Sequence, residues 1–149
     1  MRIVGLDHGS RRIGVAVGDT ETGMAFARKA IQRRNLDRDL VLIGEVCAAE
    51  EAGLIVIGLP RNMDGSEGAQ AVAARGFGEH LGRIGLAVAY EDERLTSWEA
   101  GERMAGEGRR PSRRSGELDS TAARLILQQY LDAHSMTPSH DPAHPEETE

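Results

Sequence analysis

The sequence predicts an α/β domain built on a mixed five-stranded sheet, with three antiparallel strands followed by two parallel strands, flanked by helices. Three observations predict this class. Residues 2–7 (RIVGLD) and 13–17 (IGVAV) are rich in β-branched side chains and alternate like neighbouring strands. Residues 54–58 (LIVIG) form a short apolar run, typical of a central strand covered on both faces. Helical patterns separate the later strands, as in α/β proteins.

The first half of the chain reads as a hairpin, a third strand and a helix. The glycine-containing segment 8–12 joins the first two strands as a β-hairpin, and a third strand covers residues 25–31. Residues 37–52 form a helix, because Leu40, Ile43 and Cys47 recur at the spacing of one apolar face, and Gly53 ends it.

The second half alternates strands with helices. The loop 60–68 leads from the central strand into a helix that ends near Gly82 or Gly85, and residues 86–90 form the last strand. Thr96 and Glu99 make a capping box for a helix over 97–107. A mobile loop over 106–116 precedes an amphipathic helix from Asp119 to about residue 133. This order of elements is that of a ribonuclease-H-like sheet.

Length and composition indicate one globular domain over residues 1–134 and a disordered acidic tail over residues 135–149. A chain of 149 residues fits one domain, and 40% apolar with 28% charged residues is ordinary for a soluble protein. No apolar run is long enough to cross a membrane and no signal sequence is seen, so we expect a cytoplasmic protein. The single cysteine, Cys47, has apolar neighbours, which indicates a buried side chain.

The net charge of −6 does not exclude a nucleic-acid partner. The tail holds four acidic residues and no Lys or Arg, which leaves 18 basic and 20 acidic residues, a net charge of −2, in the rest of the chain. Arginines occur there in pairs, and guanidinium groups match phosphate oxygens in a bidentate fashion. Seven arginines close in sequence to the candidate acids discussed below are expected to contact a nucleic-acid backbone. They are Arg11, Arg12, Arg94, Arg109, Arg110, Arg113 and Arg114.

Three acids are placed where they could share a metal ion. Asp7 ends the first strand, Glu93 follows the last strand, and Asp119 opens the final helix. Carboxylate oxygens are the ligands that Mg²⁺ prefers, and a pair of such ions can stabilise both the attacking and the leaving oxygen of a phosphodiester cleavage. We therefore expect Asp7, a glutamate of the acidic cluster 91–93 and Asp119 to bind Mg²⁺ or Mn²⁺ and to be catalytic.

Each candidate has an alternative reading. Asp119 could simply cap the helix. Glu91 and Glu93 share one face of the strand, so alternation does not choose between them. His8 could orient a phosphate or move a proton, or it could hydrogen-bond its own turn. The segment 62–65 (NMDG) could line the same cleft or form an ordinary turn.

Four segments resemble the blocks of the YqgF/RuvX family, in order and at suitable spacing. They are residues 5–19 (GLDHGSRRIGVAVGD), 55–68 (IVIGLPRNMDGSEG), 92–100 (DERLTSWEA) and 119–132 (DSTAARLILQQYLD). The resemblance implies a ribonuclease-H-like fold, related to Holliday-junction resolvases, and a role in trimming the 5′ end of precursor 16S ribosomal RNA. It also implies that Asp7, Glu93 and Asp119 are the site acids.

The chain departs from the family pattern at a few positions. His8 stands where an aromatic residue is usual, Ser10 where Thr is usual, and Gly18 where Ser is common. Related resolvases carry a catalytic acid at the end of the fourth strand, where this chain has Gly58, Leu59 and Pro60. The departures leave Asp7, Glu93 and Asp119 unchanged.

Several functions are compatible with these features. A metal-dependent nuclease in ribosome biogenesis is the first, and a Holliday junction resolvase acting on branched DNA is the alternative. A resolvase cuts two symmetric strands and calls for a homodimer, whereas an RNA-processing nuclease can be a monomer. An actin-like ATPase would need the fold twice, and the Gly-Lys-Ser/Thr of a Walker loop is missing. A non-catalytic RNA-binding module would keep the fold without needing all three acids.

Overall fold

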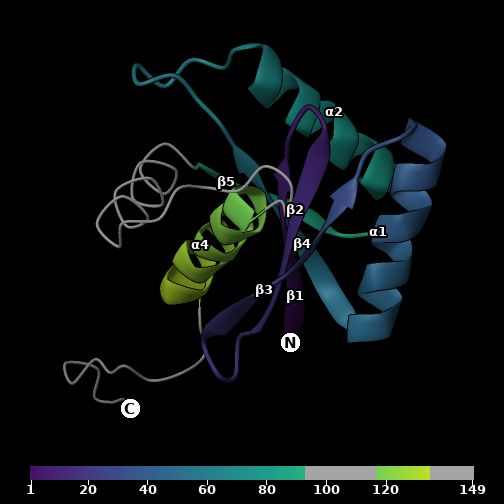
Figure 1. Cartoon of the computed structure of the whole chain (residues 1–149). Helices are drawn as coiled ribbons and strands as arrows, with labels where there is room; N and C mark the ends of the chain where they lie inside the picture. Colours follow the sequence, from purple (N-terminus) through teal and green to yellow (C-terminus); the bar gives the residue numbers. More distant parts are fainter. Residues whose placement is uncertain (93–116, 135–149) are drawn as a thin grey trace.

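The computed structural model of the chain describes residues 1–92 and 117–134, with side chains from residue 120 onward in the second range (Figure 1). Its centre is one five-stranded sheet with the order β3-β2-β1-β4-β5. β1 pairs antiparallel with β2 and β2 with β3, whereas β1, β4 and β5 run parallel to one another. The predicted mixed sheet is therefore confirmed. The strands are β1 (Arg2–His8), β2 (Arg12–Asp19), β3 (Met24–Gln32), β4 (Ala52–Leu59) and β5 (Val88–Asp92).

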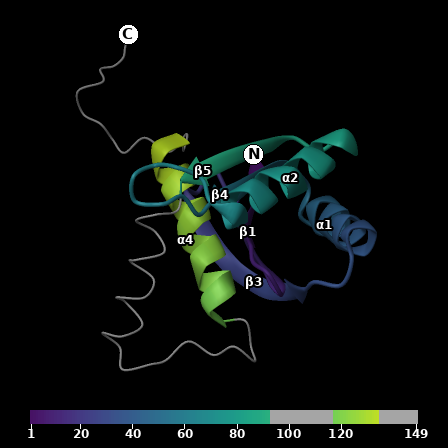
Figure 2. The ribbon, with the colours of Figure 1, turned by 90° about the horizontal axis from the view of Figure 1, so that it is seen from above.

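Helices cover both faces of the sheet. α1 (Leu36–Glu50) and α2 (Ala69–Arg83) pack on one face, and α4 (Glu117–His134) packs alone on the other (Figure 2). β1 and β4 are central and contribute side chains to both layers of the core, which explains the continuous apolar run in β4. The layer beneath α4 is formed by Ile3, Ala16, Ala25, Val56, Ala123, Ile126, Leu127 and Leu131.

The boundaries of α1 and β5 differ from the predicted ones. α1 begins one residue earlier than expected, because the side chain of Asn35 caps it by accepting a hydrogen bond from the amide of Arg38 at 2.9 Å. It ends at Glu51, which adopts the left-handed conformation with φ of 56°, so the prediction that Gly53 ends the helix is wrong. β5 begins two residues later than predicted, at Val88.

α4 begins at Glu117, so Asp119 lies in its first turn and not at the cap position. The N-cap interpretation of Asp119 is therefore wrong, although an acid in the first turn still suits the helix dipole. The predicted helix over 97–107, the mobile loop over 106–116 and the tail over 135–149 lie outside the described residues.

Cys47 is buried against the sheet, as predicted, and its burial raises the pKa of the thiol. In the described part of the chain, no helix has the length and apolar character needed to cross a membrane.

Candidate active site

The carboxyl ends of β1, β4 and β5 meet at one edge of the sheet, and Asp7 lies there. The last paired position of β1 and β4 joins Leu6 to Ile57, so Asp7 stands level with Gly58 one residue further on. Gly58 in turn pairs with Glu91 of β5. Asp7 and Glu91 thus flank a glycine that places no side chain between them, on strands about 10 Å apart.

Asp7 and Glu91 share the sheet face that α4 covers. Gly5 lies two residues before Asp7, hence on the same face, and it packs directly on α4. A Cβ atom at Gly5 would stand 2.8 Å from the Cβ of Leu127 and 3.3 Å from the carbonyl oxygen of Ala123. On β5, the carboxylate of Glu91 accepts a hydrogen bond from the side chain of Gln129 of α4. Both acids therefore face the helix that carries Asp119.

The first turn of α4 lies near the same edge of the sheet. The hydroxyl of Ser120 donates to the carbonyl oxygen of Arg28 at 2.7 Å, and Arg28 is level with Leu6 through their common partner Val15. Residue 119 lies one helical turn before Ala123, which touches Gly5, so it is on the helix face that follows β1. One turn of helix and two residues of strand both advance the chain by about 6 Å. The fold therefore brings the backbone of Asp119 towards Asp7.

Glu93 lies outside the described residues, as do Arg94, Arg109, Arg110, Arg113 and Arg114. Gln129 of α4 holds the end of β5, the strand that leads into Glu93. Gln129 donates to the carboxylate of Glu91 and also to the carbonyl oxygen of Asp92, the latter at 3.2 Å. It fixes the last two residues of β5 against α4, so Glu91 is engaged in holding the strand. Gln129 was not predicted from the sequence, where its one signal is a polar side chain next to the apolar stripe of α4.

Asp92 points to the sheet face opposite α4, as alternation predicted. It is the last member of a row of ion-paired side chains. Arg61 lies 3.9 Å from the carboxylate of Asp92 and 3.4 Å from that of Glu67. Arg75 of α2 binds Glu67 in a bidentate fashion at 2.7 and 2.8 Å and stacks over the ring of Tyr90 at 5.0 Å. The hydrogen bond from Arg75 is the main reason why the pKa of Glu67 is lowered. This network, which the sequence did not reveal, ties the loop after β4 to β5 and α2.

The loop over residues 60–68 is closed on itself. Arg61 and Glu67 form a β-bridge across its base, and the side chain of Asn62 donates to the hydroxyl of Ser66 at 2.9 Å. The hydroxyl of Ser66 donates to Asp64 at 2.6 Å. These contacts are those of an ordinary strand-to-helix turn, which favours that interpretation of residues 62–65 over a role in lining the cleft.

His8 belongs to β1 and not to the turn that follows it. It is the last residue of β1, only 9% exposed, and its side chain lies on the face of α1 and α2, with its ring centroid 4.8 Å from that of Phe77. Burial, helped by the charge of Arg33, lowers its pKa from 6.5 to about 4. The ring is therefore neutral at pH 7 and packs where an aromatic side chain would fit. The interpretation of His8 as a turn residue that hydrogen-bonds its own loop is not supported, because His8 ends β1 and its ring packs on Phe77.

The neutral ring of His8 predicts a pH-dependent stability. Since its pKa is lower in the folded chain than in the unfolded one, the unfolded state takes up a proton first as the pH falls below 6.5. We expect His8 to cost about 1 to 2 kcal/mol of folding free energy between pH 6.5 and 4, after allowance for solvent at the sheet edge. His8→Phe keeps a ring on Phe77 and cannot titrate, so urea unfolding at several pH values should show a flatter profile. An identical profile in both proteins would contradict the assignment.

The hairpin arginines lie beside Asp7. Arg12 begins β2, two residues before Gly14, which pairs with Asp7, so it is on the same face as Asp7. The turn before it is held by the amide of Gly9, which donates to the carbonyl oxygen of Arg12 at 2.9 Å. Arg11 is exposed, and its carbonyl oxygen accepts from the amide of Arg33 at 2.8 Å. Arg12 is thus the arginine that the described structure brings next to the candidate acids.

The described side chains form only part of a binding site for a cation that prefers oxygen ligands. Within residues 1–92 and 120–134, no cluster of three His, Cys, Asp or Glu side chains could hold a metal ion. Asp7 supplies a carboxylate at this edge of the sheet, and the carboxylate of Glu91, on the same face, is held by Gln129. Hard cations such as Mg²⁺ accept such a partial protein set, because water and substrate phosphate complete it.

A family model and curated relatives match most of the chain. Residues 1–133 match the family model described as "RuvX: Holliday junction resolvase". A relative from Synechococcus elongatus is 46% identical over 134 residues, with 87% of each chain covered, and one from Moorella thermoacetica is 44% identical over 133 residues, with 89% of this chain and 95% of the relative covered. Both carry the name "Putative pre-16S rRNA nuclease".

Solved structures share the fold at low identity. The RuvC structure of Thermus thermophilus is similar with a TM-score of 0.57 at 16% identity, over 90% of this chain and 96% of that one. The same protein "in complex with Holliday junction substrate" is similar with a TM-score of 0.54 at 15% identity, over the same shares. These likenesses support the ribonuclease-H-like architecture predicted from the order of elements.

Proposed function

The chain belongs to the RuvX family, and from this premise we propose that it is a metal-dependent nuclease that hydrolyses a phosphodiester at the 5′ end of precursor 16S ribosomal RNA. The observation that carries the proposal is the arrangement of Asp7, Glu91 and the first turn of α4 on one face at the carboxyl edge of the sheet. The names of the relatives, which match almost the full described chain, support ribosomal RNA as the polymer. A bacterial cytoplasmic location follows from such a substrate.

Asp7, Glu93 and Asp119 are the proposed ligands of Mg²⁺ or Mn²⁺. When bound, the cation would neutralise charge on the phosphate and lower the pKa of a water molecule. Of the described residues, Asp7 offers its carboxylate from the end of a rigid central strand. Glu91 serves as the anchor through which Gln129 fixes the strand that leads into Glu93.

The arginines have a different role. Arg12, beside Asp7, is proposed to bind a phosphate oxygen next to the bond that is cut, and Arg11 to bind a neighbouring phosphate. Arg94, Arg109, Arg110, Arg113 and Arg114 are proposed to complete this contact. With its pKa lowered to about 4, His8 is neutral at pH 7 and does not add a positive charge to the phosphate contacts. Attack by water on phosphorus and loss of the leaving oxygen would then depend on the acids and the bound cation.

A substrate comparison tests the proposal. The purified full chain is offered a precursor 16S ribosomal RNA 5′ leader and a four-way DNA junction, in parallel and with ATP as a third assay. We expect cleavage of the RNA with Mg²⁺ or Mn²⁺, loss of cleavage when EDTA removes the cation, and recovery when the cation is restored. Cleavage of the junction alone would favour the resolvase, acting as a homodimer, over the RNA-processing monomer. ATP hydrolysis without cleavage of either polymer would overturn the proposal.

A further inference from the structure

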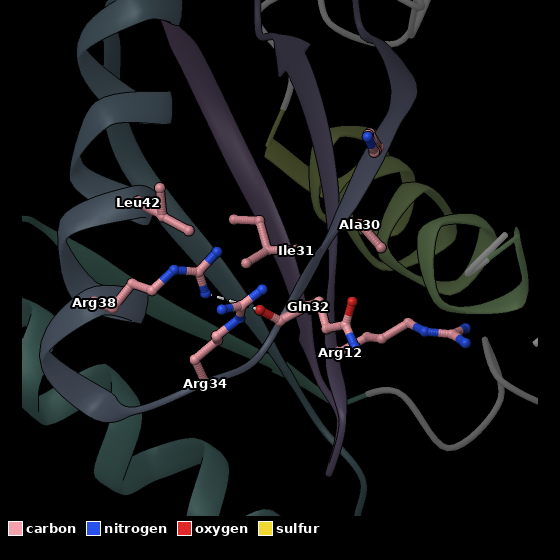
Figure 3. Close-up of a pocket in the computed structure, with 8 residues that line it drawn as sticks. Arg12, Ala30, Ile31, Gln32, Arg34, Arg38 and Leu42 are labelled. Carbon is pink, nitrogen blue, oxygen red and sulfur yellow. Dashed lines mark hydrogen bonds between the residues drawn. The ribbon is translucent and has the colours of Figure 1, made fainter. Parts of the chain in front are cut away.

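A basic cleft lies between the end of the edge strand β3 and the start of α1 (Figure 3). We call it the β3 cleft. Its volume is about 370 Å³, and its lining residues include four basic residues and no acidic residue. Ile31 and Leu42 supply the apolar part of the wall. The cationic residues are Arg12, Lys29, Arg34 and Arg38.

A β-bulge shapes the cleft. β2 and β3 pair Val15 with Arg28 and Ile13 with Ile31, so two residues of β3, Lys29 and Ala30, stand opposite one residue of β2. Such an insertion bends an edge strand and redirects its side chains. Both inserted residues line the cleft. The irregularity is therefore part of how the cleft is built.

Most of the positive charge in the β3 cleft is uncompensated within the described residues. Arg38 is the exception, since it lies 3.6 Å from the carboxylate of the buried Asp39 and donates to the carbonyl oxygen of Gln32 at 3.0 Å. Arg12, Lys29 and Arg34 form no ion pair with any described carboxylate. Like charges gathered around a cavity repel one another, and an anion placed among them relieves that repulsion.

The cleft lies at the same edge of the sheet as the candidate active site. Arg12 and Gln32 pair at the same edge of the sheet as Asp7, and β3 lies two strand spacings, about 10 Å, from β1. Arg12 extends in the opposite direction from Arg34 and Arg38, so the cations follow one another around the end of β3 (Figure 3). A chain of phosphates leaving Asp7 on the α4 side would meet Arg12 first and the two arginines of the α1 side next.

We propose that the β3 cleft is a second phosphate-binding site, which holds the sugar-phosphate backbone of the nucleic acid several nucleotides away from the bond that is cut. This inference rests on the proposed function and adds a binding surface, formed by Lys29, Arg34 and Arg38, to the arginines near Asp7. The ligand is the backbone of a polymer: with only aliphatic apolar side chains in its described lining, the cleft offers no aromatic ring on which a base could stack.

The test compares two charge reversals in the full-length protein. Arg34→Glu changes the β3 cleft, and Arg83→Glu changes an exposed arginine in the last turn of α2 that is outside the cleft lining. Binding of labelled polyuridylic acid is measured in EDTA, so that no cleavage occurs, over a range of salt concentrations. Thermal unfolding of both variants confirms that they fold, which we expect because the side chain of Arg34 is exposed.

We expect Arg34→Glu to weaken RNA binding by at least about tenfold, the value of one charge-assisted hydrogen bond to phosphate. The slope of log affinity against log salt should fall by about 0.7, as for one lost phosphate contact on a single strand. Arg83→Glu should change affinity less than about twofold. Equal affinities and slopes in wild type and Arg34→Glu would overturn the inference, as would failure of the wild type to bind RNA.

Two further results keep this inference separate from the proposed function. If uridine monophosphate binds as tightly as the polymer and is equally sensitive to Arg34→Glu, the cleft is a mononucleotide pocket and the inference fails. If the wild type binds RNA through Arg34 yet cuts neither RNA nor DNA, the inference stands and the proposed nuclease function fails.

Discussion

Replacing Asp7 by asparagine is expected to reduce RNA cleavage at least about 100-fold, while the fold is retained. Asparagine has the same size but no negative charge, so it binds a divalent cation weakly and loses the electrostatic stabilisation of the transition state. The side chain lies at the end of a central strand, half-buried on the face of α4. We expect the variant to remain folded, because the substitution keeps the size of a half-buried side chain at the end of β1.

The matched control for Asp7→Asn is Asp132→Asn. Asp132 lies in the last turns of α4, whose C-terminal part packs against the opposite end of β1 and β2, where Leu131 contacts Gly18. The same chemical change at this position should leave the cleavage rate unchanged. Initial rates on the RNA leader at saturating Mg²⁺, with urea unfolding of each protein, check both statements. Undiminished cleavage by Asp7→Asn would remove Asp7 from the site.

Substituting alanine for Gly5 is expected to destabilise the protein by about 2 to 3 kcal/mol, through overpacking of the core. The new Cβ would stand 2.8 Å from the Cβ of Leu127, an atom fixed to the backbone of α4, so the helix itself must move away from the sheet. Because α4 carries Asp119, the displacement should also lower cleavage under conditions where the variant is still folded. The midpoint of urea unfolding and the cleavage rate measure the two effects.

Gly44→Ala is the control for Gly5→Ala. Gly44 lies within α1, and a Cβ atom there would meet no other atom within 4 Å. Alanine in the interior of a helix should stabilise the protein by about 0.5 to 1 kcal/mol relative to glycine. The two glycine substitutions should therefore have opposite signs. Equal effects would show that the close approach of α4 to β1 does not limit stability.

The fold could be predicted from the sequence to a large extent, because each element carries its own periodic pattern. Alternation identified β1 and β2, the turn at residues 20–23 indicated where β3 begins, and the apolar run identified β4 as central. Element ends were less predictable, since they depend on single contacts. Glu51 reverses the chain with a φ of 56°, which is unusual for glutamate and is supported by hydrogen bonds from its amide to the carbonyl oxygens of Ala48 and Cys47.

The candidate site could be predicted in part. The strand end at Asp7 follows from the local pattern, and the first turn of α4 was located to within two residues. Long-range side-chain contacts could not be predicted, because Gln129 meets Glu91 only after α4 has packed across the sheet. Likewise, nothing in the sequence near His8 reveals that its ring packs on Phe77 and loses its affinity for protons. Glu93 remains a prediction from the family resemblance.

The long separation between Asp7 in β1 and Asp119 in α4 affects when the enzyme can first act. The two residues are 112 positions apart in the sequence, and translation at about 5 to 20 residues per second takes roughly 6 to 22 seconds to cover that distance. During this interval the nascent chain already displays its first acid and its hairpin arginines, but α4 has not been synthesised. If Asp119 is a metal ligand, as proposed, the unfinished polypeptide lacks part of the site, and cleavage is expected only after α4 has been synthesised and has packed on the sheet.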